Sequence, residues 1–285
     1  MALEDEISLL VAASNELTGV VSAKVGEIDS KVLEAQSKFD QLHASEFPEK
    51  VENALYLSVH IDPDNGDDGL DGLSENKAIK SSARLSSLVT AAKCHYLSVY
   101  IKSGTTFLLG HRVSVPERIN FYSYGSGSGP TILRQSLSAY ATLSSLRVHF
   151  ASVNVYTYKA AENEVISQPI YQSRALFSGV KYVSFNGGGC YVCDNQLFHY
   201  HNAGSGDVFF PIIMSFYNAK ISSMPSSVGV SGAAKKVFSF FSSSSPYPVD
   251  LFCTLTAFEL NEVHATVLDF LGCQSGNLRS NVALT

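Results

Sequence analysis

Apolar side chains recur at alternating steps of three and four residues along the first part of the chain. This spacing places them on one stripe of an α-helix, and the extra step of four from Val21 to Val25 is typical of a stutter in a coiled coil. The stripe, called the seam below, consists of Ile7, Leu10, Ser14, Leu17, Val21, Val25, Ile28, Val32, Ala35, Phe39 and Leu42. So narrow a stripe leaves an isolated helix marginal, which favours self-association of parallel helices as a trimer or a dimer. The alternative is a helix packed on the chain's own globular part.

A different pattern begins at residue 54. Apolar and polar residues alternate over Ala54–Ile61, the period of a half-buried strand. A loop rich in Asp and Gly follows, and these residues close tight turns; its key members are Asp62, Asp64, Gly66, Asp68, Asp71 and Gly72. A helix is predicted next over Lys77–Ala92, with apolar positions Ala78, Ile79, Leu85, Leu88, Val89 and Ala92.

Beyond Lys93 the chain consists of short β-rich segments between Ser, Gly and Asn breaks. Predicted strands are Tyr96–Ile101, Ile119–Tyr124, Leu146–Thr157, Val180–Phe185, Ile212–Ile221, Val237–Phe241, Leu251–Phe258 and Val263–Leu271. Three strands and their turns need roughly 22 residues, so this part would form about eight or nine coils of a β-solenoid. A β-sandwich or a mixed trimeric β-structure is the alternative.

Charge divides the 285 residues into three zones. Residues 1–53 have a net charge of −7, residues 62–75 contain six acidic side chains and no basic one, and residues 76–285 have a net charge of +7. Only 16% of residues are charged and there is no Trp, while 45% are hydrophobic. This composition excludes a disordered chain and argues against a nucleic-acid-binding protein. It predicts three parts: a stem over 1–53, a cap over 54–92 and a β-rich body over 93–285.

Targeting signals and cysteines add little. The acidic start does not resemble a secretory signal, and no stretch is long and apolar enough to insert into a membrane. Five cysteines in a chain this long are not a disulfide scaffold, so synthesis in a reducing cytoplasm is expected.

Two segments carry a resemblance to known proteins. A strand ending in Asp62-Pro63, a Gly/Asp loop, Asp-Gly-Leu-Ser at 71–74 and a helix together resemble the entry cap of right-handed parallel β-helices in pectate-lyase-like proteins and phage tailspikes. Residues 9–29 resemble the opening helix of bacteriophage tail fibre proteins.

The resemblance implies a mainly β fold: an N-terminal trimeric coiled-coil stem followed by a right-handed parallel β-helix. It implies a structural virion protein, made in the host cytoplasm and located in the phage tail. The homotrimer would attach to tail or baseplate proteins through its stem. Its body would recognise host polysaccharide or lipopolysaccharide during adsorption, without a cofactor. An adaptor fibre that joins the tail to other receptor-binding proteins, or a polysaccharide depolymerase, is the alternative.

Candidate glycan contacts follow from the aromatic content. Tyrosine rings can stack on sugars where Trp is absent, and the candidates are Tyr122, Tyr124, Tyr156, Tyr158, Tyr191 and Tyr200. A depolymerase would need a pair of carboxylates. The candidates are Asp194 with Asp207, and more weakly Glu162 with Glu164. Because acidic residues are scarce after residue 76, a protein without enzymatic activity is favoured.

Three metal or redox hypotheses are weighed against simpler structural roles. Asp62, Asp64 and Asp68 have spacings loosely like a calcium loop, but no Glu stands at the twelfth position, so a capping turn is favoured. His199 and His201 would lie on one face of a strand and would place six imidazoles around a trimer axis; surface or core histidines are the simpler interpretation. Cys190 and Cys193 form a C-x-x-C pair without a second pair at zinc spacing, so buried strand cysteines are predicted.

Overall fold

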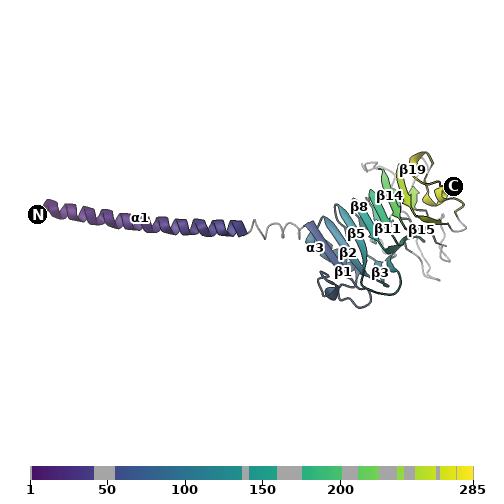
Figure 1. Ribbon diagram of the computed structural model, residues 1–285, viewed down its shortest axis with the longest axis horizontal. Coiled ribbons are helices and arrows are strands. Elements are labelled where there is room, and N and C mark those ends of the chain that lie inside the picture. The colour runs from purple at the N-terminus through teal and green to yellow at the C-terminus, as the bar shows by residue number, and fades with distance from the viewer. Residues whose placement is uncertain are drawn as a thin grey trace. The chain divides into compact units, whose positions relative to one another are not determined.

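The computed structural model of the chain describes residues 2–41, 55–136, 141–158, 175–200, 211–224, 236–240, 248–260, 264–273 and 275–284 (Figure 1). The chain divides into two units, Met1–Asn53 and Ala54–Thr285, which are described separately. The fold is mainly parallel β-sheet with one long N-terminal helix, as the sequence predicted.

The first unit contains helix α1 (Ala2–Gln41). Its composition suits a helix, because it lacks proline and places Glu4 in the first turn and Lys38 in the last, where each charge opposes the helix dipole. Lys38 also pairs with Glu34 at 2.6 Å, a favourable spacing of four residues. Every side chain from Leu3 to Gln41 is exposed. No helix in the described ranges combines the length and apolar character needed to cross a membrane.

The second unit contains three sheets in which all strands are parallel. The bounds of their strands are as follows. The eight-stranded sheet consists of β1 (Tyr56–Ile61), β2 (Tyr96–Lys102), β5 (Arg118–Tyr124), β8 (Arg147–Ala151), β11 (Tyr182–Asn186), β14 (Ile212–Tyr217), β17 (Val249–Thr254) and β19 (Leu278–Ser280). The six-stranded sheet consists of β3 (Thr106–Leu109), β6 (Thr131–Gln135), β9 (Val153–Tyr156), β12 (Gly189–Val192), β15 (Lys220–Ser223) and β18 (Ala257–Glu259). The five-stranded sheet consists of β4 (Val113–Ser114), β7 (Leu143–Ser144), β10 (Phe177–Ser178), β13 (Phe198–Tyr200) and β16 (Phe238–Phe240).

From β2 to β16 the chain visits the three sheets in a fixed order. It passes from the eight-stranded to the six-stranded to the five-stranded sheet, and then returns to the first sheet beside the strand it left. Each turn therefore adds one strand to every sheet, an arrangement consistent with a β-helix-like fold. Figure 1 shows the strands of successive turns stacked along the body.

Stacked apolar side chains fill the interior. Phe121, Phe150, Phe185 and Phe216 occupy matching positions on consecutive strands, and their rings stack at centroid distances of 4.9–5.2 Å. All four are at most 1% exposed. The parallel register explains this column, because residues at equal positions on neighbouring strands point to the same face.

The corners between the eight-stranded and six-stranded sheets recur at the same place in successive turns. Ser152, Asn218 and Leu255 each stand between a strand of the first sheet and a strand of the second, and each has a positive φ of 46–57°. Gly187 has a φ of 72° at the equivalent corner between β11 and β12. The turn thus requires a left-handed residue, whether or not it is glycine.

These corners correct the strand predictions. Leu146–Thr157, Ile212–Ile221 and Leu251–Phe258 were each predicted as one strand, but each divides at its corner into two strands that belong to different sheets. The prediction failed because the alternation of apolar and polar residues continues almost unbroken through the corner.

Two helices also differ from prediction. The capping helix α3 (Ser82–Ala92) starts five residues later than predicted, after a short 3₁₀ turn, η2 (Glu75–Lys77). Ile79 instead forms a parallel bridge with Ile61, and the Ser81 hydroxyl accepts a hydrogen bond from the Arg84 N–H and so begins the helix.

The last predicted strand, Val263–Leu271, is wrong where it is described. Residues 267–271 form helix α4 (Val267–Leu271), which Thr266 caps and Gly272 ends in the left-handed conformation. A 3₁₀ turn, η3 (Ser275–Asn277), follows.

The eight-stranded sheet has one strand before residue 93 and seven after it, fewer than the eight or nine predicted coils. Long connections reduce the number; β8 begins at Arg147 and β11 only at Tyr182.

Candidate functional site

The Asp/Gly loop covers the free edge of β1. Its backbone extends the hydrogen-bond ladder: His60 N donates to Gly72 O at 2.7 Å, Asp62 N donates to Ile79 O at 2.9 Å, and Ile79 N donates to His60 O at 3.0 Å. A bare strand edge invites pairing with another chain, so the loop closes the sheet. Gly72 adopts a φ of +74° here, and an added Cβ would lie 2.9 Å from Val59 Cγ1.

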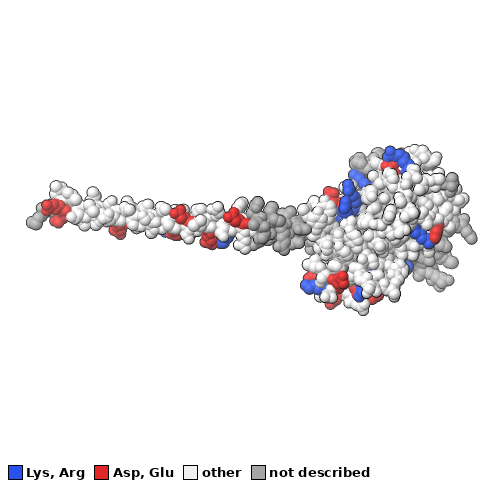
Figure 2. All heavy atoms as spheres, in the orientation of Figure 1, with Lys and Arg blue, Asp and Glu red and all other residues white. Residues whose placement is uncertain are grey.

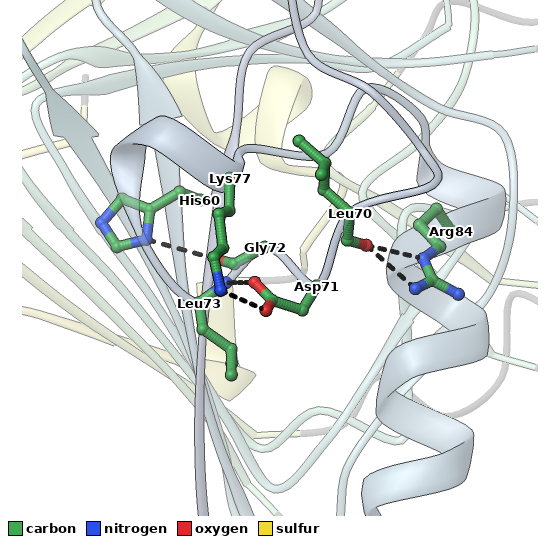
Figure 3. A network of polar contacts seen from close by, with 7 residues as sticks. All are labelled: His60, Leu70, Asp71, Gly72, Leu73, Lys77 and Arg84. Carbon is green, nitrogen blue, oxygen red and sulfur yellow. Dashed lines mark hydrogen bonds and ion pairs between the residues drawn. The ribbon is translucent and has the colours of Figure 1, made fainter.

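Side chains of the loop hold it in this conformation (Figure 3). Asp71 accepts a hydrogen bond from Leu73 N and an ion pair from Lys77, both at 3.0 Å. Arg84 of α3 donates to Leu70 O through Nε at 3.2 Å and Nη2 at 2.9 Å. The loop is therefore tied both to itself and to the helix that follows it.

Two further carboxylates complete the cap. Asp62 is 5% exposed, accepts the N–H groups of Asp64 and Asn65, and pairs with Lys102 of β2 at 2.5 Å. Burial acts to raise the pKa of Asp62, but these hydrogen bonds outweigh it and hold the pKa below its ordinary value. Asp68 accepts Lys80 N at 2.8 Å and Ser81 N at 2.9 Å, just before α3.

Carboxylate oxygens proposed as calcium ligands accept backbone hydrogen bonds in the structure. Asp62 and Asp68 direct carboxylate oxygens at backbone N–H groups, which are turn and helix caps. Glycine is required at position 66 because the backbone there passes close to the backbone at Ile79: an added Cβ would lie 2.4 Å from Ile79 O. Within the described ranges no three Asp, Glu, His or Cys residues form a group that could hold a metal ion.

A column of aromatic rings runs along the outer face of the eight-stranded sheet. His60, Tyr100 and Tyr122 occupy one register position on β1, β2 and β5, and their rings stack at 4.9 and 5.2 Å. Tyr124 meets the His60 ring edge-on at 5.2 Å. Tyr122 and Tyr124 are half-buried. Because the Tyr122 ring already stacks on Tyr100, a sugar could contact mainly the edge of the Tyr122 ring.

A second column lies on the outer face of the six-stranded sheet. The Tyr156 and Tyr191 rings stack at 4.3 Å with an angle of 6° between them, and the guanidinium of Arg134 lies 5.5 Å from the Tyr156 ring. Gly189 makes room for this stack, because a Cβ there would lie 2.8 Å from the Tyr191 ring. Tyr158 is only 6% exposed. The side chain of Tyr200 lies outside the description.

Only one of the four carboxylate candidates, Asp194, lies within the described residues. Asp194 is 1% exposed and lies in a buried polar corner, where its N–H donates to Tyr158 O at 2.7 Å. Next to it, Asn195 Nδ2 donates to Gln135 Oε1 at 2.9 Å. Asp207, Glu162 and Glu164 fall outside the described residues, so neither pairing is tested.

The histidine and cysteine candidates are placed only in part. His199 lies on β13, but its side chain and all of His201 are outside the description. Cys190 lies on β12 and Cys193 directly after it, and both are buried, which confirms the prediction of buried cysteines. Burial raises the pKa of the Cys190 thiol, so it stays protonated and unreactive.

The seam residues from Ile7 to Phe39 all lie on α1, and all are exposed. Leu42 lies outside the described residues. Exposed apolar side chains of this size include Leu10 at 74% and Phe39 at 65%. An isolated helix with so narrow an apolar stripe is marginal in water, and exposed apolar stripes are typical of association surfaces.

Two basic residues on the body were missed by sequence reasoning. Arg118 and Arg147 open β5 and β8 and are neighbours in register. A short internal repeat was the available signal: residues 118–121 read Arg-Ile-Asn-Phe and residues 147–150 read Arg-Val-His-Phe. The same spacing of apolar, polar and Phe recurs at 182–185 and 213–216.

Comparisons with known proteins add no identification. Neither the protein-family models, nor the curated proteins, nor the solved structures contain a match to this chain.

Proposed function

We propose that the chain is a structural protein of a phage virion, a tail fibre or tailspike that takes part in recognising glycans on the host surface. In this proposal the chain is a homotrimer. Three copies of α1 form a parallel coiled-coil stem that attaches to tail or baseplate proteins. The body is a right-handed parallel β-helix, the hand that connections between parallel strands overwhelmingly take.

The seam is the observation that carries the proposal. A 40-residue helix with every described side chain exposed has no packing of its own, and its apolar positions fit the heptad spacing. A second and third copy would cover the seam and leave the polar flanks in water. Val and Ile on the seam are as compatible with a trimer as with a dimer.

The small number of charged side chains on the body supports the same proposal. Most of the surface visible in Figure 2 is uncharged, and acidic and basic side chains lie in a few small groups. A trimer would repeat each weak surface contact three times, so that avidity raises the overall affinity for a host surface. The cap closes the edge of β1, which keeps such bodies from pairing edge to edge.

Immunogold electron microscopy tests the virion assignment. An antibody raised against the body is applied to phage particles from cultures that encode the chain. Gold at the tail is the expected result. Particles that stay unlabelled, while the antibody detects the purified chain, would contradict the proposal.

Adsorption measurements separate the terminal adhesin from the adaptor and the depolymerase. Purified chain that binds host cells and blocks infection is expected. Failure to bind cells would assign it to an adaptor fibre, and release of new reducing ends from host polysaccharide would assign it to a depolymerase.

A further inference from the structure

Two arginines lie side by side on the outer face of the eight-stranded sheet. Arg118 and Arg147 are the first residues of β5 and β8 and are directly paired in the parallel register. The residue after each, Ile119 or Val148, is fully buried, so alternation turns both arginines outward. Neighbouring strands are about 4.8 Å apart, and two positive charges are therefore held close together.

Neither guanidinium forms an ion pair or a side-chain hydrogen bond with any described residue. Another arginine at the same register position, on the last strand of the sheet, does have an acidic partner. There Arg279 of β19 is paired with Asp250 of β17, and both of its hydrogen bonds to the carboxylate are 2.6 Å long. Like charges directly opposite one another on neighbouring strands are unfavourable, so the arginine pair weakens the sheet unless something neutralises it.

Two neutral hydrogen-bonding side chains lie on the same outer face as the arginines, and one acidic residue, Glu117, immediately precedes Arg118. His149 lies two residues after Arg147 on the same outer face, and its Nδ1 is 2.7 Å from Ser184 Oγ. Burial and, after it, the charge of Arg118 hold the pKa of His149 below its ordinary value, so the imidazole is neutral at pH 7. Tyr122 lies 6.3 Å from the His149 ring, and burial raises its pKa, which keeps the phenol protonated.

We propose that Arg118 and Arg147, flanked by His149 and Tyr122, bind an oxyanion group of an acidic polysaccharide. This inference rests on the proposed role in glycan recognition and names the chemical class of the glycan. A sulfate, phosphate or carboxylate placed between the two guanidiniums accepts hydrogen bonds from both and cancels their repulsion. The Tyr122 hydroxyl and the imidazole beside them offer hydrogen bonds to sugar hydroxyls.

Calorimetric titration of the full chain tests the proposal with three polymers. Dextran sulfate and polygalacturonate carry sulfate and carboxylate groups, and plain dextran is the neutral control. Both acidic polymers are expected to bind, dextran is not, and affinity should fall as salt is added. The stronger of the two acidic polymers identifies the preferred oxyanion. Equal binding of dextran, or no binding of either acidic polymer, would overturn the proposal.

Substitutions locate the site. Arg118→Gln and Arg147→Gln should each weaken binding about tenfold, the usual effect of losing a charged hydrogen bond. Arg112→Gln is the matched control, because Arg112 is exposed and donates to Ser144 Oγ on the five-stranded sheet, away from the pair. It removes the same charge and should change affinity less than about twofold. An equal loss in all three variants would show attraction by net charge alone and would contradict the site.

The melting temperature of the free variants excludes a purely structural role. Removing one of two opposed charges should leave the melting temperature unchanged or raise it. A clear fall in both variants would assign the arginines to the fold and overturn the proposal. The outcome is independent of the immunogold result: labelled tails without polymer binding would refute the site alone, and polymer binding with unlabelled particles would refute the virion role alone.

Discussion

At the scale of single residues, the corners of the body require a left-handed backbone conformation, which some of the residues found there adopt more easily than others. Leu255 has a φ of 52° and is 75% exposed, whereas Asn218 holds the equivalent corner one turn earlier with a φ of 46°. The left-handed region is unfavourable for most side chains, and Asn is among the few that enter it readily. Leucine at position 255 therefore makes the body less stable than asparagine would at the same corner.

Exchanging these residues should have opposite effects. Leu255→Asn is expected to raise the free energy of unfolding by about 1 kcal/mol, and Asn218→Leu to lower it by about the same amount. Urea denaturation of both variants measures the two values. A destabilised Leu255→Asn would mean that the exposed leucine makes a contact that stabilises the body, contrary to the structure.

Asp62 predicts a pH dependence of the cap. Its folded pKa is lower than its unfolded value of about 3.9, so its contribution is complete above that pH and is lost as the pH falls through the folded value. Asp62→Asn should lower the free energy of unfolding by about 1–3 kcal/mol at pH 6, as expected for charged hydrogen bonds. Urea denaturation at pH 6 and pH 3 should show a smaller difference between wild type and variant at pH 3. A difference that is equal at both values would rule out this ionic role.

At the scale of elements, the phenylalanine column of the eight-stranded sheet should dominate the stability of the body. Phe185 stacks between Phe150 at 4.9 Å and Phe216 at 5.0 Å, in the middle of the stack. Phe185→Ala should lower the free energy of unfolding by about 3–5 kcal/mol because it opens a cavity in the core. Phe252→Ala is the control, since Phe252 is 51% exposed on β17 and should change the value by less than about 0.5 kcal/mol.

If Phe185→Ala fails to fold, Phe185→Leu gives a smaller loss that is still measurable. Similar effects at Phe185 and Phe252 would contradict the stacked core.

Helix α1 carries two glycines that test which face is the seam. Gly19 and Gly26 have open space around them, and neither is a seam residue. Replacing either by Ala should stabilise the helix by about 0.8 kcal/mol, so amide exchange in α1 of the full chain should slow about fourfold, as measured by mass spectrometry. Faster exchange would show that the glycines lie at a close helix–helix contact and that the seam is on another face.

The same elements show how far sequence patterns reach. The alternation of β1, β2 and β5 follows from local burial, and α1 follows from the spacing of its apolar residues and its lack of proline, so the positions of these elements could be predicted closely. The corner at Ser152 could not, because apolar positions continue past it and only a positive φ marks the change of sheet. The short repeat at 118–121 and 147–150 was the available signal for the opposition of Arg118 and Arg147, but the alternation within either segment does not specify the register between turns 29 residues apart.

At the scale of the whole molecule, the proposed assembly depends on what covers the seam. The three sheets bury their own apolar residues, and the cap closes the edge of β1. Helix α1 buries none of its described side chains. In the proposed function, self-association through the seam is the step that covers these side chains.

Sedimentation equilibrium of the full chain measures this step directly. A trimer has a mass three times that of the 30.8 kDa chain, and we expect a single chain when Val25 and Ile28 of the seam are both replaced by Asp. Lys31→Asp is the control for added acidic charge on a polar flank, and it should leave the trimer intact. A wild-type chain that stays a monomer at micromolar concentration would contradict a coiled-coil stem.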